Sequence, residues 1–101
     1  MADFKLSELA KKDLEGIAEY TLREWGETQN RISLEAFESQ FQLLANQSGL
    51  GKKCDRLGHG LMRWEVGKHV AFFRRAKGGI LIIRVLHQSM LPEGLELGEP
   101  G

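Results

Sequence analysis

The spacing of apolar residues changes near the middle of this chain, and that change constrains the fold more than any other feature of the sequence. Between about residues 7 and 46, apolar side chains recur every three or four positions, which is the period of an amphipathic helix. After about residue 60 they alternate, which is the period of a strand. A chain of 101 residues has the size of one domain with one core. The sequence therefore predicts helices and a sheet that share a single core, an α+β fold.

The first half of the chain predicts a short strand and two helices. Residues 2–6 alternate between apolar and polar side chains, and Ser7 is a suitable N-cap for a helix. Gly26 ends that helix as a C′ glycine, and a second helix is expected from Glu27 to about residue 45. Helices joined this closely form an αα-hairpin, which must bury its apolar face against another layer. That face is expected to contain Ala10, Leu14, Ile17, Thr21 and Trp25 from the first helix and Leu34, Phe37, Phe41 and Leu44 from the second.

The second half predicts three antiparallel strands joined by short glycine-containing turns. The strands are expected at residues 61–66, 69–75 and 80–87, after a loop at residues 46–60. The last strand is the most apolar, so we expect it at the centre of the sheet with Leu81, Ile83 and Val85 facing the helices. The order β-α-α-β-β-β predicts a helical hairpin packed on an antiparallel sheet. This single domain is expected to occupy residues 1–90. Residues 91–101 contain both prolines and are expected to form an irregular tail.

The composition favours a protein without cofactor or metal. The one cysteine, Cys54, has neither a disulfide partner nor the Cys/His spacing of a zinc site. His59 and His69 lack a carboxylate at ligand spacing. The glycines are not followed by Lys-Ser or Lys-Thr, so no phosphate-binding loop is expected. Charged residues interrupt the apolar residues of the N-terminal region, so we expect neither a signal peptide nor a membrane span, and a cytoplasmic protein.

Charge is unevenly distributed, although the formal net charge is zero. Residues 49–90 carry nine Lys/Arg against two Asp/Glu, whereas residues 1–48 carry nine acids against five bases and residues 91–101 carry three acids alone. A basic middle suggests a surface for an anionic partner; the alternative is that the halves neutralise each other within the fold. The balanced total does not support strong nonspecific binding to nucleic acid, and we expect no direct sequence-specific binding.

An ordered set of short motifs resembles the ParE toxins of the RelE/ParE toxin–antitoxin superfamily. Its strongest part is GKHVAFFR at residues 67–74, followed ten residues later by RVLH at residues 84–87 and then by Met90. The Trp-Gly pair at residues 25–26 matches at the expected spacing. The resemblance covers about residues 4–90 and implies the same β-α-α-β-β-β arrangement that the periodicity predicts independently.

The resemblance implies a bacterial toxin that inhibits growth by poisoning DNA gyrase, stalls that enzyme on broken DNA and stabilises plasmids. It also implies a ParD-type antitoxin that forms a hetero-oligomer with the toxin. RelE-like relatives share the fold but cut messenger RNA on the ribosome, and fold alone does not separate the two activities. A third reading is a toxin-fold protein that is no longer toxic and persists as a binding partner. Ser89 and Leu91 favour this reading, because many relatives have Arg and Asp there.

The C-terminal strand favours an inhibitor over a nuclease. RNA cleavage without a metal needs a base, an acid and cations at the phosphate. Arg84 and His87 supply part of this set, but residues three apart in a strand point to opposite faces. Nuclease-type relatives carry a C-terminal tyrosine, whereas the only tyrosine here is Tyr20, and residue 73 is Phe. We therefore expect no catalytic residues and no enzymatic activity.

The sequence and the resemblance together predict two binding surfaces. We expect target contact and toxicity to depend on Arg63, Arg74, Arg84, His87 and Met90, and Arg84→Ala to abolish toxicity without unfolding the protein. Arg63 and Arg84 are expected on the solvent face of the sheet, where they can pair with Glu65 or present planar donors to a carboxylate or phosphate. The alternatives are solubility and cross-strand pairing for the arginines, and a core-margin position with backbone hydrogen bonds for His87. A groove between hairpin and sheet is expected to seat an antitoxin helix or strand. We expect antitoxin contacts from Leu14, Trp25, Phe37, Phe41 and Trp64, of which Trp25, Phe37 and Phe41 also fit the core stripes.

Overall fold

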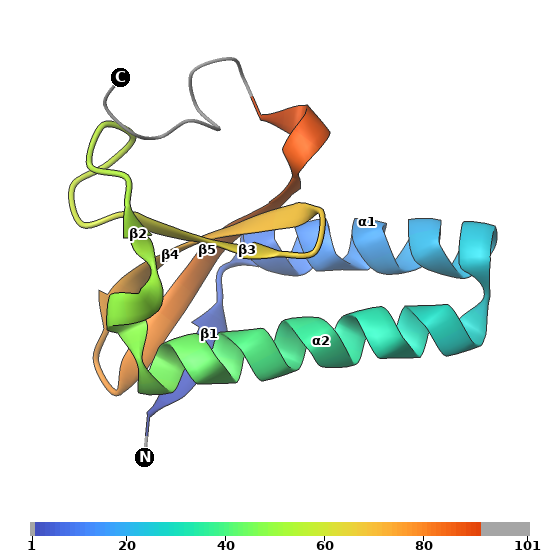
Figure 1. Ribbon diagram of the computed structural model, residues 1–101, viewed down its shortest axis with the longest axis horizontal. Helices are drawn as coiled ribbons and strands as arrows, with labels where there is room; N and C mark the ends of the chain where they lie inside the picture. The colour runs from blue at the N-terminus through green and yellow to red at the C-terminus, as the bar shows by residue number, and fades with distance from the viewer. Residues whose placement is uncertain (1, 92–101) are drawn as a thin grey trace.

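Two helices cover one face of a five-stranded sheet in the computed structural model, which describes residues 2–91 (Figure 1). The helices are α1 (Glu8–Trp25) and α2 (Glu27–Asn46), and the strands are β1 (Asp3–Leu6), β2 (Lys52–Lys53), β3 (Met62–Val66), β4 (His69–Ala76) and β5 (Gly79–His87). Two short 3₁₀ helices, η1 (Ser48–Leu50) and η2 (Gln88–Met90), follow α2 and β5. The predicted α+β fold is confirmed. Apart from Leu91, the expected tail at residues 91–101 lies outside the described residues.

Two residues define the boundaries of the helical hairpin. Ser7 caps α1, because its Oγ accepts a hydrogen bond from the Ala10 N–H at 3.0 Å. The same hydroxyl donates to the Ile83 carbonyl at 2.7 Å and so attaches the start of α1 to β5. Gly26 ends α1 with a φ of 91°, which favours glycine, and its N–H donates to the Leu22 carbonyl. Both predicted boundaries are confirmed.

The sheet is mixed rather than purely antiparallel, which corrects one detail of the prediction. Its strand order is β1-β5-β4-β3-β2, with β1 parallel to β5 and the other neighbours antiparallel. The two hairpin turns specify only the neighbours β3, β4 and β5, so the open side of β5 is left for β1. Gly79 permits this pairing, because a Cβ there would collide with the carbonyl of Asp3. The sequence does not predict β2, since two consecutive lysines show no alternation.

A bulge in β5 changes which of its residues face the helices. Pairing between β4 and β5 shifts by one residue at Phe72/Phe73, so Ile83 is an extra residue in β5. The β5 residues buried in the core beneath the helices are Ile80, Ile82 and Val85. The expected position of Val85 is confirmed. The expectation that Leu81 and Ile83 share its face is wrong, because it assumes an unbroken alternation along the strand.

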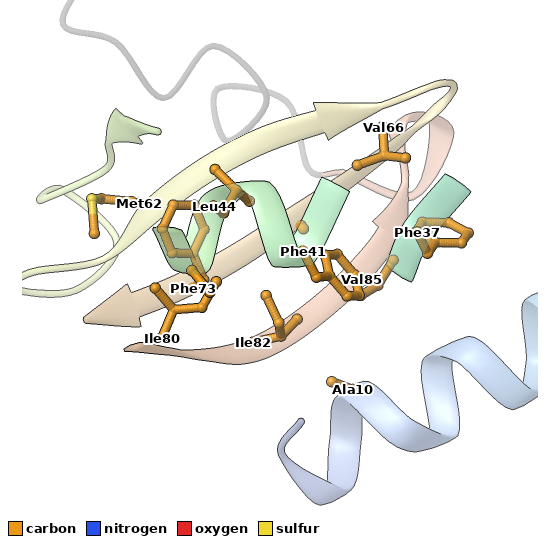
Figure 2. Close-up of a cluster of buried hydrophobic side chains, with 12 residues drawn as sticks. Ala10, Phe37, Phe41, Leu44, Met62, Val66, Phe73, Ile80, Ile82 and Val85 are labelled. Atoms are coloured by element: carbon orange, nitrogen blue, oxygen red, sulfur yellow. The ribbon is translucent and has the colours of Figure 1, made fainter. Parts of the chain in front are cut away.

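The core lies between α2 and the sheet, as Figure 2 shows. Phe37, Phe41 and Leu44 of α2 meet side chains of β3, β4 and β5. Phe41 is 1% exposed, and the edge of its ring packs against Phe4 with 5.5 Å between the ring centroids. Phe73 is fully buried in the same cluster. The predicted core positions of Phe37, Phe41 and Leu44 are confirmed.

The hairpin is longer than the sheet that it covers, so its far end extends past the strands (Figure 1). Ala10 and Thr21 are buried and Leu14 and Ile17 are partly buried, as the stripe on α1 predicts. Trp25 is 69% exposed, however, and its expected core position is wrong. Helical periodicity identifies one face of a helix but does not show where the layer beneath that face ends.

Candidate functional site

The extended part of the hairpin borders a groove of about 1110 Å³, which we call the hairpin groove. It lies between α1 and α2 and reaches the β3–β4 turn and η2. Its apolar lining residues are Ile17, Tyr20, Trp25, Ala36, Phe37, Val66 and Met90, and its polar ones include Lys12, Asp13, Gln29, Lys68, His69 and His87. A concave, mainly apolar surface of this kind is typical of a site that receives a partner.

Three large side chains of the hairpin groove are open to solvent. Trp25 is 69% exposed, Met90 61% and Tyr20 55%. Aromatic and methionine side chains are the residue types enriched in the buried centre of protein interfaces. Gly16 and Ala36 are also exposed in the groove, and a Cβ at Gly16 would meet no atom within 4 Å apart from its chain neighbours and the adjacent backbone of its own helix. The groove therefore combines apolar anchors with small residues that leave room for a helix or strand.

The residues predicted for antitoxin contact fall into two groups. Trp25 and Phe37 line the hairpin groove. Leu14, Phe41 and Trp64 belong to the core instead, and the Trp64 Nε1–H donates to Gln40 Oε1 at 2.7 Å. Sequence reasoning missed Tyr20 and Ile17 as groove residues. Ile17 belongs to the same helical stripe as Trp25, and Tyr20 follows Ile17 by three positions, so this spacing is a signal that could have included both.

The two histidines at the sheet end of the groove form a cross-strand pair. His69 faces His87 with 5.1 Å between ring centroids and also touches Phe37 at 5.4 Å. Burial lowers the pKa of His69, and the neighbouring charge of His87 lowers it further. The Ser89 N–H donates to His87 Nδ1 at 3.0 Å, so in the neutral ring the hydrogen lies on Nε2. His87 therefore occupies the core-margin position that was the alternative to a target contact, and it accepts a hydrogen bond from the backbone.

The lowered pKa of His69 predicts a stability that decreases in mild acid. Below the ordinary value of 6.5, the unfolded chain binds a proton at His69 more readily than the folded protein does. The free energy of unfolding is therefore expected to fall as the pH drops through 6.5 and to level off below the folded pKa. Thermal unfolding of the wild type and His69→Gln between about pH 7.5 and about pH 5 measures this difference. Equal pH dependence in the two proteins would contradict it.

Arg84 forms an ion pair with Asp13 of α1. Its Nε donates to Asp13 Oδ2 at 2.8 Å and its Nη2 to Asp13 Oδ1 at 3.0 Å, a bidentate pair. The Val85 N–H donates to the same carboxylate at 2.9 Å. The hydrogen bond to Asp13 raises the pKa of Arg84, although burial acts in the opposite direction. Arg84→Ala would therefore remove a fold contact, so lost toxicity in that variant would not by itself identify a target contact.

Asp13→Asn is expected to lower the free energy of unfolding by about 2 kcal/mol, because charge-assisted hydrogen bonds contribute roughly 1.5–3 kcal/mol. The Asp13 side chain is only 14% exposed, so water replaces Arg84 poorly. Urea unfolding measures the change, with Glu15→Gln on an exposed part of α1 as the matched control. Identical stability of the two variants would show that the ion pair contributes nothing.

The residues predicted for target contact are not gathered in one patch. Arg63 is 9% exposed, and its Nη2 lies 3.4 Å from Glu65 Oε2 on the same strand, so this pair is not a cross-strand one. The Arg74 Nη1–H donates to the His59 carbonyl in the loop before β3. His87 and Met90 line the hairpin groove, at the other end of β4. Their role in target contact stays a prediction.

Two further properties concern the described residues only. Between residues 2 and 91, no group of three or more His, Cys, Asp or Glu side chains is placed to hold a metal ion. Neither α1 nor α2 is long and apolar enough to cross a bilayer, and the described chain has no other candidate helix for a span.

The sequence matches the family described as the ParE toxin of the type II toxin–antitoxin system parDE over residues 4–92. It is 36% identical to Toxin ParE1 of Caulobacter vibrioides over 90 residues, covering 89% of this chain and 93% of that protein. It is 33% identical to Toxin ParE of Escherichia coli over 91 residues, covering 89% of this chain and 88% of that protein.

A solved structure described as the chromosomal ParDE TA system from P. aeruginosa has the same fold. The TM-score is 0.72 at 19% sequence identity, over 86% of this chain and 96% of the matched chain. At this identity the likeness concerns the fold alone.

Proposed function

This chain belongs to the ParE toxin family of type II toxin–antitoxin systems, and from that membership we propose that it arrests growth by binding DNA gyrase and stabilising cleaved DNA. A cognate ParD-type antitoxin binds the toxin and neutralises it. The system acts in the cytoplasm and, when carried on a plasmid, stabilises that plasmid. The family match over residues 4–92 carries this proposal.

The hairpin groove is the proposed seat of the antitoxin. It offers exposed Trp25, Tyr20 and Met90 side chains on a concave apolar surface, and an amphipathic helix or an extended segment fits such a surface. Burial of these side chains in a complex would remove the three most exposed large apolar side chains of the described residues from water. Toxin and antitoxin therefore form a hetero-oligomer.

The proposed action is binding rather than catalysis. Phe73, which stands where many relatives have tyrosine, is 0% exposed in the core. Arg84 is held by Asp13, so its guanidinium is already engaged within the fold. His87 and Ser89 remain at the end of β5, with 2.8 Å between His87 Nδ1 and Ser89 Oγ. This pair offers one titratable ring, and the only tyrosine of the sequence, Tyr20, lies on α1 and not at the C-terminal strand, which favours the inhibitor over the ribosome-dependent nuclease.

Controlled expression in a bacterial host tests the proposal. Expression of the chain alone is expected to stop growth, and co-expression of a ParD-type antitoxin from the same operon is expected to restore growth and to copurify with the toxin. A parallel assay on translating ribosomes separates the RelE-type alternative. Cut messenger RNA in that assay would overturn the proposal, and growth without arrest would favour the non-toxic binding partner.

A further inference from the structure

A second concave surface lies at the end of the sheet opposite the hairpin groove. It has a volume of about 420 Å³ and is lined by Lys53, Asp55, His59, Arg74 and Arg75 together with Gly60, Leu61 and Met62. We call it the basic pocket. His69 of the hairpin groove begins β4, whereas Arg75 of the basic pocket comes near its end. Strands rise about 3.3 Å per residue, so roughly 20 Å separates the two surfaces.

Positive charge is concentrated at the basic pocket. The side chains of Lys53, Arg74 and Arg75 are exposed, and Asp55 is the one carboxylate in its described lining. Lys52 on β2 and Lys77 in the β4–β5 turn are close in sequence to the lining residues Lys53 and Arg75. Both lysines are exposed and add to the positive charge of this region. These residues account for much of the excess of bases between residues 49 and 90. Most of the bases of the middle segment therefore lie in or beside the basic pocket, whereas Arg84 is paired with Asp13 of the first half.

The pocket is built to present cations. The Arg74 guanidinium is fixed by its hydrogen bond to the His59 carbonyl, which leaves other N–H groups of the fork for a ligand. The Asp55 carboxylate accepts a hydrogen bond from the Gly60 N–H at 3.4 Å, so part of its acceptor capacity is used within the loop. Of the two large apolar side chains in the lining, Met62 is 7% exposed and Leu61 is partly buried, whereas the charged side chains of Lys53, Arg74 and Arg75 are exposed. The surface suits a hydrophilic polyanion better than an apolar peptide.

We propose that the basic pocket binds the phosphate backbone of duplex DNA without reading its sequence. Phosphates repeat at regular intervals along a strand, so one duplex engages several exposed lysines and arginines at once. The inference rests on the proposed function, because the DNA that would contact the basic pocket is the segment bound by gyrase. Because the pocket is distant from the hairpin groove, DNA contact and antitoxin docking use different surfaces.

Fluorescence anisotropy of a labelled duplex of about 20 base pairs tests this inference on the purified toxin. We expect weak binding, with Kd in the range of about 10⁻⁶ to 10⁻⁴ M, and a log–log salt slope of about −3 for roughly three phosphate contacts. Lys53→Glu/Arg75→Glu is expected to weaken binding at least about tenfold and to flatten the slope. Arg23→Glu/Arg31→Glu changes two exposed residues of the helical hairpin, outside both surfaces, by the same net charge and is expected to bind as the wild type does.

Equal loss of binding in the two double variants would overturn the inference, because net charge and not the pocket would then explain the binding. Competition by a polyglutamate peptide as effective as that by unlabelled duplex would also overturn it, in favour of an acidic protein. Gyrase poisoning measured on the same samples separates the two proposals. Poisoning without DNA binding refutes only the pocket, whereas DNA binding without poisoning refutes only the proposed function.

Discussion

Trp25→Ala is expected to weaken binding of a ParD-type antitoxin by about 30-fold or more while leaving the free energy of unfolding almost unchanged. The indole is 69% exposed in the free protein, so its removal costs the fold little. In the complex it would be the largest apolar side chain to fill the hairpin groove. Tryptophan anchors of this kind contribute about 2 kcal/mol or more to binding, which corresponds to the expected factor.

Titration calorimetry with the purified antitoxin measures this effect, and Ile32→Ala is the matched control. Ile32 is a large apolar side chain on the same hairpin and is 51% exposed, but it does not line the hairpin groove. The control is expected to bind with wild-type affinity. If Ile32→Ala weakened the complex as much as Trp25→Ala, the antitoxin would be seated on another face of the hairpin.

Phe41→Ala is expected to lower the free energy of unfolding by about 3–5 kcal/mol, the usual cost of truncating a buried phenylalanine. Phe41 is 1% exposed and packs against Phe4 and Phe37, with 5.5 and 5.8 Å between ring centroids. It thus connects β1 to α2 at the centre of the core. The total free energy of unfolding of a domain of this size is about 5–15 kcal/mol. At a typical growth temperature of about 37 °C the variant would therefore be only marginally folded.

Urea unfolding followed by circular dichroism measures the loss, with Phe41→Leu as the control. Leucine retains most of the apolar volume and is expected to cost less than about 1.5 kcal/mol. A loss below about 1 kcal/mol for Phe41→Ala would mean that the site collapses around the cavity and that this ring is not central to the core.

The sequence predicts most of the fold because the signals that specify it are local. The N-cap at Ser7, the left-handed glycine at Gly26 and the turn at residues 67–68 each determine an element boundary through a few neighbouring residues. Long-range pairing has no such signal. The parallel contact between Asp3 and Gly79 joins the two ends of the domain, and neither residue indicates its partner in the sequence.

The candidate site is less predictable because it depends on where regular patterns stop. The bulge at Ile83 places the residues before it on the opposite face of the sheet from the one that simple alternation predicts. Because β5 is apolar along most of its length, its sequence pattern does not show where the bulge lies. The stripe on α1 continues to Trp25 beyond the strands, so a residue that reads as core is exposed. The ion pair between Asp13 and Arg84 links residues 71 positions apart and cannot be read from spacing.

Antitoxin docking and gyrase poisoning together form the central claim, and a gyrase cleavage assay with the purified toxin tests it most directly. Gyrase and supercoiled plasmid are incubated with the toxin, the protein is denatured, and linear DNA is measured on a gel. We expect linear DNA to accumulate with toxin concentration and to disappear when an equimolar ParD-type antitoxin is added first. Normal supercoiling without cleaved DNA, at toxin concentrations above that of gyrase, would contradict the account.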